Sequence, residues 1–491
     1  MPCKNSISTP FKVKELKFVI NIAWNEIIIL WRRKGFQWLL LVLMVFTGYA
    51  IVSGVSRYRE VHTQREALKD SLREMFLHQD PKSPHMAGHY GHIVFKPYAI
   101  LQAIDQGVES YTGTTIRLEA HRQNDAVFSP ASTQSSLIRF GEFSFSVLLQ
   151  VVIPLLIIFI CYGSIVTDRK NGTLKILLSQ GASLRKLVFS KIVAYHTFFT
   201  AFLVLIIALF YLFIGIEIGH AALPMVTGRL LLIIILYSMY YGIVIALTIY
   251  FSAIANSIPG LLTSLLAIWF IWTIILPKLT ASLGAVSYPL ITKAQFNQEL
   301  TSLKANELNG HDWKNEKTKA FIDSVLTAHR VDSIQKLPFR LKGLLMQADE
   351  EVKNRIHDKV FSNIRDTIRL QNNVSSFSGI INPFIVVKKL SMALSSTDVY
   401  HHFHFLEEAE SYRRRLIKEL NDEDTHKHSE FKDERGRVSA DFWARIQDFE
   451  YRPAPLPWSL RNSKIEIAVL FLWLFITFGI IYNRTPHIGI V

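Results

Sequence analysis

Residues 145–167 read FSVLLQVVIPLLIIFICYGSIVT and contain no formally charged side chain. At the helical rise of about 1.5 Å per residue, such a run covers the roughly 30 Å hydrocarbon core of a bilayer. Five further runs have the same character. The six apolar segments are 36–55, 145–167, 187–216, 230–252, 258–277 and 464–483. The sequence therefore predicts an all-α membrane protein with six transmembrane helices.

Charged residues are almost absent from these runs, and we expect the exceptions Glu217 and Arg229 to lie at helix ends, where long side chains reach water. Some thirty-five residues precede the first run, and no small-residue cleavage site follows a short apolar core. We therefore expect the first run to be a retained anchor and not a cleaved signal peptide.

The basic residues are concentrated in two short segments. Residues 1–36 hold seven basic and two acidic side chains, and residues 168–191, DRKNGTLKILLSQGASLRKLVFSK, hold six and one. The two segments carry most of the net charge of +14, whereas the long segments 56–144 and 278–463 are close to neutral. This distribution indicates membrane lipid and not nucleic acid as the contact of the basic residues.

The positive-inside rule then gives a topology in the cytoplasmic (inner) membrane. Residues 1–35, the connector 168–186 and the tail 484–491 are expected to be cytoplasmic, with both termini on that side. The insertions 56–144 and 278–463 are expected to be extracytoplasmic, or periplasmic. The period of residues 11–36, with tryptophans at the boundary, predicts that the N-terminal segment forms a helix lying in the cytoplasmic interface.

The two insertions are too long and too regularly patterned for disorder. Helices are predicted near residues 296–308, 313–330, 345–371 and 398–421, and a further helix follows the first span. We expect the insertions to assemble into one mainly helical domain. The only cysteines are Cys3 and Cys161, so this domain is expected to have no structural disulfide.

The connector has the pattern of a short amphipathic helix between two spans. Asn171 or Thr173 can cap its start, Gly181 can end it in a left-handed turn, and Ser183 can cap the next helix. Leucines recur at helical spacing along one face, and basic residues surround them. This arrangement is suited to docking on a partner, although a simple anchor to anionic lipid has the same composition.

No GxxxxGK[ST] phosphate loop occurs in the sequence, and the connector is too short to hold a nucleotide-binding domain. Any ATP, with its Mg²⁺, is therefore expected on a separate subunit, and no cofactor is expected on this chain. The sequence also has no nucleophile elbow, no HExxH motif and no convincing carboxylate pair, so we do not expect an enzyme and name no catalytic residue.

The segment DRKNGTLKILLSQGASLRKLVFSKI, residues 168–192, resembles the cytoplasmic loop of type 2 ABC exporter permeases. The six spans and the interfacial helix are similar to the fold of that family. HYGHIVFKP (89–97), GVESYTG (107–113), LEAHRQND (118–125), STDVYHHFHFLEEAESYRRRL (396–416) and PAPLPWSLRNSKIEIAVLFLWL (453–474) extend the resemblance. They resemble a subgroup with large extracytoplasmic insertions, many known only as a domain of unknown function and some related to the permease of nitrous-oxide reductase maturation.

The resemblance implies a permease subunit that pairs with an ABC ATPase subunit and with a second permease, either a copy of itself or a similar paralogue. An extracytoplasmic partner is a further expectation, for export of a cargo or for mechanical work. In that family the loop is a coupling helix that seats in the ATPase. The residues expected to couple are Gly172, Thr173, Leu174, Leu177, Leu178, Arg185 and Lys186.

Fourteen of the seventeen histidines lie in the two insertions. His401, His404 and Glu408 share one helical face, and His85, His89 and His92 crowd a short segment, so either group is a candidate for zinc or copper. Packing and hydrogen bonding are the alternative that we favour, and we expect no metal. A membrane-anchored metal-binding or metal-delivery protein is nevertheless the rival to the permease. His196, within the third run, is expected to form an interhelical hydrogen bond.

Overall fold

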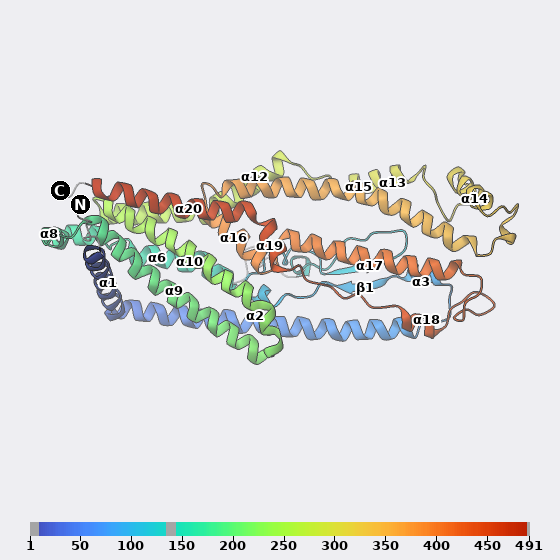
Figure 1. Cartoon of the computed structure of the whole chain (residues 1–491), viewed down its shortest axis with the longest axis horizontal. Coiled ribbons are helices and arrows are strands. Elements are labelled where there is room, and N and C mark those ends of the chain that lie inside the picture. Colours follow the sequence, from blue (N-terminus) through green and yellow to red (C-terminus); the bar gives the residue numbers. More distant parts are fainter. Residues whose placement is uncertain (1–8, 134–143, 489–491) are drawn as a thin grey trace, which may run out of the picture.

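The computed structural model describes residues 9–133 and 144–488. Figure 1 shows an elongated molecule, with long apolar helices at one end and a second, mostly helical body at the other. We call this second body the distal domain; it comprises the end of the first long helix, residues 78–133 and residues 288–463. Predictions on residues 1–8, 134–143 and 489–491, Cys3 among them, lie outside the described residues.

Six helical segments in the described ranges are long and apolar enough to cross a membrane. They are α2 (Lys34–Leu77), α5 to α7 (Phe145–Lys170), α9 (Leu184–Glu217), η4 with α10 (His220–Ile254), α11 to α12 (Ile258–Ser287) and α20 (Lys464–Arg484). Each contains one of the six predicted runs, so the predicted fold class is confirmed. The chain is a multi-pass membrane protein.

Two of these segments contain a π-turn directly before a proline. In the first, α5 (Phe145–Val147) and η3 (Leu148–Val152) lead into α6 (Ile153–Cys161), which carries Pro154. In the second, α11 (Ile258–Phe270) and η5 (Ile271–Ile275) lead into α12 (Leu276–Ser287), which carries Pro277. A proline ring collides with the carbonyl one turn earlier and lacks an N–H, so the wider turn accommodates it without ending the span.

The N-terminal helix α1 (Thr9–Arg32) packs along α9 and ends just before α2 begins. Figure 1 shows α1 turned steeply away from the direction of α2. Ala23 and Leu30 are buried, whereas Trp24 and Trp31 are exposed, and Trp31 directly precedes the basic residues at the end of the helix. Exposed tryptophans next to arginines are typical of a helix at a membrane interface, the position predicted from the sequence.

Helix α2 joins the two ends of the molecule without a break. Its 44 residues extend over about 66 Å at the usual helical rise, more than a bilayer core requires. The second half of α2 runs along the distal domain (Figure 1). The helix predicted after the first span is therefore a continuation of that span, and the distal domain is attached to the membrane region through a rigid element.

The main core of the distal domain lies between α2, a short sheet and α17 (Val399–Thr425). The sheet pairs β1 (His92–Phe95) antiparallel with β2 (Thr115–Leu118), with Val94 opposite Ile116. Helices α3 (Pro84–Tyr90) and α18 (Ala440–Arg445) close this core, which includes the buried Phe405 and Trp443. The prediction that the two insertions form one domain agrees with this arrangement, because both insertions supply the core.

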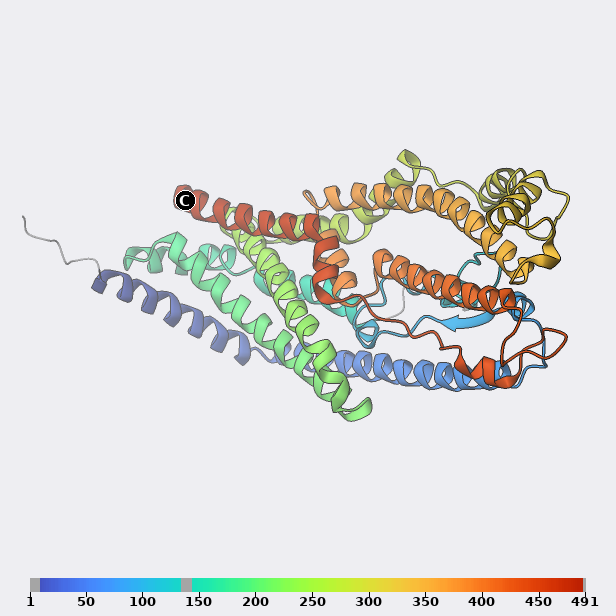
Figure 2. The ribbon, with the colours of Figure 1, turned by 45° about the vertical axis from the view of Figure 1, so that its right-hand side comes forward.

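Four helices predicted in the second insertion occur with shifted ends: α13 (Lys293–Lys304), α14 (Glu316–Ala328), α15 (Leu341–Ser378) and α17. Figures 1 and 2 place α14, in yellow, at the far end of the distal domain from the short helix α8. A small core around Ile322, Leu337 and Leu341 joins this tip to α15. Short helical elements complete the chain: η1 (Ile100–Ala103), α4 (Pro130–Thr133), η6 (Ile334–Lys336) and η7 (Thr485–His487).

Helices α15 and α17 approach each other closely at Gly343. A Cβ atom placed there would collide with the Asn421 carbonyl oxygen and would lie 2.5 Å from the Thr425 nitrogen. Because backbone atoms cannot move aside locally, Gly343→Ala is expected to destabilise the distal domain by about 1–3 kcal/mol. Thermal unfolding of the purified chain measures this, with Gly479→Ala, a site with open space around it, as the control. Equal stability of the two variants would contradict the close approach.

The part of the distal domain that borders the membrane helices, which we call the junction, contains two helices that were not predicted from the sequence, α16 (Pro383–Leu394) and α19 (Leu456–Asn462). Apolar side chains of α16 are buried against α10 and α20. The expectation that Arg229 reaches water is wrong, because it is 9% exposed. Its guanidinium donates to the carbonyls of Ala393, Leu394 and Ala454 at 2.8–3.2 Å, and thereby ties α10 to the junction.

Candidate functional sites

The connector between the second and third spans folds as two short helices at the end of the molecule opposite the distal domain (Figure 1). Helix α7 (Val166–Lys170) is followed by α8 (Thr173–Ser179). Gly181 has φ 89° and Ser183 accepts from the Lys186 N–H, so both predicted caps are confirmed. The predicted start is wrong: Gly172, with φ 77°, takes the N-cap position. A left-handed residue there favours glycine over Asn171 or Thr173.

Two anchors tie the connector to the membrane helices. Lys191 of α9 is buried, and its Nζ lies 2.9 Å from Asp168 Oδ2 and 2.6 Å from Glu26 Oε1 of α1. Arg169 donates to the carbonyls of Ala253 and Ala255 at the end of α10. Helices α9 and α10 thus hold α7 directly, and α1 is joined to it through Lys191.

The exposed face of α8 differs from the predicted leucine face. Leu174 is 1% exposed and packs in the core of this chain, and Leu177 and Leu178 are half-buried against the same core. Leu174 is therefore unavailable to a partner, which corrects that part of the predicted docking face. Lys175 and Ile176 are exposed on the opposite side. The guanidinium of Arg185 lies over the ring of Tyr482, 4.7 Å from its centroid.

A second candidate site, which we call the histidine cluster, lies in the distal domain. His85 and His89 come from successive turns of α3, His121 follows β2, and His311 lies between α13 and α14. His85 Nε2 is 3.1 Å from His89 Nε2 and 3.4 Å from His121 Nε2, which is 3.2 Å from His311 Nε2. One nitrogen from each ring lies within 4.8 Å of the others, and the chemistry of four convergent imidazoles is that of a transition-metal site.

A chain of side-chain hydrogen bonds fixes the orientation of the His85 ring. Gln347 Nε2 donates to the Glu351 carboxylate, and Gln347 Oε1 accepts from Asn421 Nδ2. Asn421 Oδ1 therefore faces His85 Nδ1, at 2.8 Å, and accepts a hydrogen bond from its N–H. Burial lowers the pKa of His85 to about 4, and its Nε2 is directed into the cluster.

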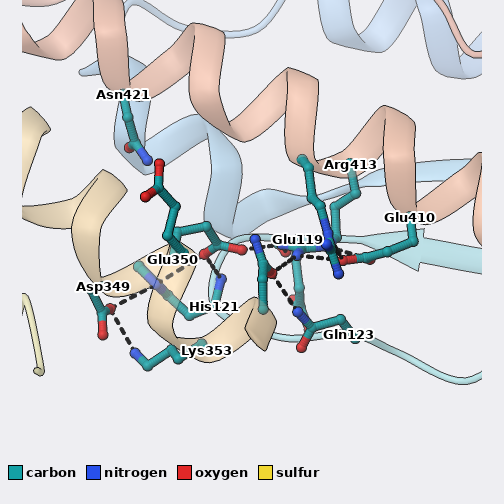
Figure 3. A network of polar contacts seen from close by, with 12 residues as sticks. Glu119, His121, Gln123, Asp349, Glu350, Lys353, Glu410, Arg413 and Asn421 are labelled. Carbon is teal, nitrogen blue, oxygen red and sulfur yellow. Dashed lines mark hydrogen bonds and ion pairs between the residues drawn. The ribbon is translucent and has the colours of Figure 1, made fainter. Parts of the chain in front are cut away.

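Two buried carboxylates fix the His121 ring. Figure 3 shows His121 beside Asp349 and Glu350; Lys353 pairs with Asp349, and Arg413 reaches Glu350 from α17. His121 Nδ1 lies 3.0 Å from Asp349 Oδ2 and 3.2 Å from Glu350 Oε2. Burial lowers the pKa of His121, but the two carboxylates outweigh it and raise this pKa overall. Because the carboxylates contact Nδ1, Nε2 is the ring nitrogen that is left to coordinate a metal ion.

The arginine run 413–415 forms ion pairs both within α17 and with α15. Arg413 does pair with Glu410, with Nε to Oε2 at 2.7 Å, but it is also buried and binds Glu350 and Asn354 of α15. Burial raises the pKa of Glu350, whereas His121 and Arg413 lower it, to about 2 in sum. Arg413 therefore connects the helix pairing to the carboxylates behind the histidine cluster.

The other predicted histidines have internal partners. His401 contacts Asp398 through Nδ1 at 2.6 Å and Ser459 through Nε2 at 3.0 Å, and His404 Nδ1 contacts the Tyr451 hydroxyl at 3.1 Å. Neither belongs to the histidine cluster, nor does Glu408. His196 of α9 contacts the Ser238 carbonyl of α10 at 3.1 Å, which confirms the predicted interhelical hydrogen bond.

His92 does not join His85 and His89, because Gly91 ends α3 at φ 76° and His92 begins β1. His121 and His311 were not predicted from the sequence to belong to one group with His85 and His89. The spacing of His85 and His89, four residues apart on one helix, was the available signal. No local pattern places the other two beside them, since they are far apart in the chain.

Residues 293–452 match the family described as a domain of unknown function, DUF3526. The chain contains a DUF3526 domain. No curated protein matches the chain. The DUF3526 segment covers α13 to α18, and so includes His311 and the supporting Asp349, Glu350 and Asn421. The three remaining histidines of the cluster precede the DUF3526 segment, so the cluster is complete only when the first insertion packs against it.

Proposed function

We propose that this protein is the permease subunit of an ATP-binding cassette exporter. A separate ATPase subunit would bind ATP and Mg²⁺ and hydrolyse the nucleotide at the cytoplasmic face of the membrane. A second permease subunit, a copy or a similar paralogue, would complete the translocation unit. The DUF3526 domain and the rest of the distal domain would then lie outside the cytoplasm, where they gate export or transmit force to a further partner.

The observation that supports this proposal is the way in which α8 is attached to the membrane helices while one of its faces stays exposed. A helix of seven residues between two left-handed glycines presents a small face with Lys175 and Ile176, which is 57% exposed. Behind it, the Lys191 and Arg169 anchors join α7 to α1, α9 and α10. A simple lipid anchor needs neither the ion pairs of Lys191 with Asp168 and Glu26 nor the hydrogen bonds of Arg169 to α10. An element that receives force does need a rigid connection to the spans that must move.

The length of α2 supports the second half of the proposal. An unbroken helix from the α1 junction to the distal domain transmits a tilt in the membrane directly to the distal domain. At the junction, Arg229 joins α10 to α16 and to Ala454, so a second membrane helix has its own connection. Reorientation of the spans would therefore move the distal domain as a body.

The alternative function, a metal-binding or metal-delivery protein that uses His401 and His404, has less support than the permease. Both rings already have internal hydrogen-bond partners, and His401 is buried. An arrangement of this kind serves the packing of α17 against the segment around Tyr451 and Ser459. The histidine cluster is a different set of residues and is considered separately below.

Purification of the tagged chain from its native membranes tests the permease assignment. We expect an ATPase polypeptide with a phosphate loop to co-purify and to hydrolyse Mg-ATP. Ile176→Glu places a charge at the centre of the exposed α8 face and is expected to reduce ATPase co-purification at least tenfold. Ile176 is a sharper target than Leu177, because Leu177 is half-buried in this chain.

Met75→Glu is the matched control, because Met75 is 71% exposed on α2 in the distal domain and receives the same new charge. It should leave co-purification unchanged. The permease assignment fails if no ATPase accompanies the unmodified chain. The docking face alone is wrong if the ATPase is present and Ile176→Glu retains it fully.

A further inference from the structure

We propose that His85, His89, His121 and His311 together bind one divalent first-row transition-metal ion, and that Zn²⁺ is the ion that fits this site. The site would join the two insertions of the distal domain at its tip. This inference does not depend on the permease function, because it concerns the folded chain alone.

The separations between the ring nitrogens agree with a tetrahedral ion. For Zn–N bonds of about 2.0–2.1 Å, neighbouring nitrogens of a tetrahedron are about 3.4 Å apart. The three Nε2 pairs described above are 3.1, 3.2 and 3.4 Å apart. The other pairs lie within 4.8 Å, so small rotations of the more exposed rings, His89 and His311, complete the shell.

The surrounding contacts direct the Nε2 atoms of two rings inward. His85 Nδ1 donates a hydrogen bond to Asn421 Oδ1, and His121 Nδ1 lies against the carboxylates of Asp349 and Glu350. Because Nδ1 of each ring is occupied in this way, both Nε2 atoms are left to face one point, where a cation would be stabilising. Support of each ligating histidine by an amide or a carboxylate is the arrangement found around protein-bound metals.

The backbone at His121 provides an independent observation. Its φ of 62° lies in the left-handed region, which residues with a side chain rarely adopt. The His121 N–H donates to Glu350 Oε2 at 2.7 Å, and this contact holds the residue in place. Conformations of this kind persist where the surrounding structure enforces them, commonly at binding sites. Here the result is that the imidazole faces the other three.

The donor set selects the class of ion. Four imidazole nitrogens suit Zn²⁺, Cu²⁺, Co²⁺ or Ni²⁺, whereas Ca²⁺ and Mg²⁺ require oxygen ligands. Tetrahedral convergence favours Zn²⁺, which has no geometric preference of its own, over Cu²⁺, which prefers a tetragonal arrangement. The carboxylates Asp349 and Glu350 lie behind His121 and are already paired with Lys353 and Arg413.

The position of the site predicts what the ion does. His311 lies in the loop that leads to α14, and this tip is joined to the domain mainly through a small core. His85 and His89 lie on α3, which packs on α17. A bound ion would therefore fasten the DUF3526 tip to the first insertion and slow the opening of the loop around residues 305–315.

Metal analysis of the full chain in detergent tests the site. After chelation and dialysis against Zn²⁺, we expect about one zinc per chain by mass spectrometry, and Co²⁺ in its place should give the intense visible absorption of a tetrahedral complex. His89→Ala and His311→Ala should each weaken Zn²⁺ binding at least tenfold. His428→Ala, an exposed histidine away from the cluster, should bind as the unmodified chain does.

Hydrogen exchange provides a second readout that is independent of metal counting. Zn²⁺ should slow exchange of amides in residues 305–315 at least tenfold in the unmodified chain and have no such effect in His311→Ala. Unchanged unfolding temperatures of the metal-free variants show that they are folded. Less than about 0.1 zinc per chain, or equal Zn²⁺ binding by the unmodified chain and both ligand variants, would overturn the proposal. Preferred loading with Cu²⁺ and a tetragonal spectrum would overturn the assignment of zinc.

Discussion

Arg413→Ala is expected to destabilise the distal domain by about 3–5 kcal/mol, the range found when one partner of a buried ion pair is removed. Arg413 is 1% exposed and binds Glu350, Glu410 and Asn354. It also donates to the Glu119 carbonyl at 3.2 Å. Without the guanidinium, the buried Glu350 carboxylate would lose its cation and retain only the contacts with His121.

Arg414→Ala is the matched control because it removes the same side chain from the next position. Arg414 also pairs with Glu410, and with Asp358, but its side chain is 35% exposed and that of Asp358 is 51% exposed. Water screens such pairs, so a loss of about 1 kcal/mol or less is expected. Hydrogen exchange of α15 and α17 amides in the full chain measures both losses. Similar losses for the two variants would contradict the role of Arg413 as a buried connector.

The membrane helices could be predicted from the sequence because the bilayer imposes a length and a composition on each span. The same criterion failed for α16, which is apolar but has only 12 residues. Helix α16 is buried by α10 and α20 and not by lipid. An apolar run of that length is too short to be recognised as a span, and its local sequence does not show which part of the protein covers it. Arg229 was misjudged for the same reason: its carbonyl partners at Ala393, Leu394 and Ala454 come from segments remote in sequence.

The sites show a similar division between local and long-range information. Gly181 and Ser183 were correctly predicted because caps depend on a few neighbouring residues. The burial of Leu174 within this chain was not predicted. The helical period identifies an apolar face, but it does not show whether the same chain or a partner covers that face. His85 and His89 share one helix, so their spacing in the sequence predicts that they are neighbours. His311 lies beside them only because of the packing of α13 to α17, which no spacing rule predicts.

Lys191→Met is expected to have the largest effect in the membrane region. The Lys191 ammonium is buried between Asp168 of α7 and Glu26 of α1. Without it, two carboxylates face each other with no cation between them, and because Glu26 and Asp168 are partly exposed the expected cost is about 2–3 kcal/mol. If α8 receives force as proposed, the variant chain should still bind the ATPase through its exposed face, while ATP hydrolysis becomes insensitive to the state of the permease.

A double variant separates the loss of the ion pair from general damage. Glu26→Gln removes one of the two stranded charges, so Lys191→Met with Glu26→Gln should regain part of the lost stability, and the interaction free energy follows from the cycle. Lys464→Met, an exposed lysine at the start of α20, is the control for loss of a charge near the membrane and should leave stability and ATPase regulation unchanged. Regulated hydrolysis in Lys191→Met would contradict the buried anchor as the route of force, because α1 and α9 would then respond to α8 without their ionic connection to α7.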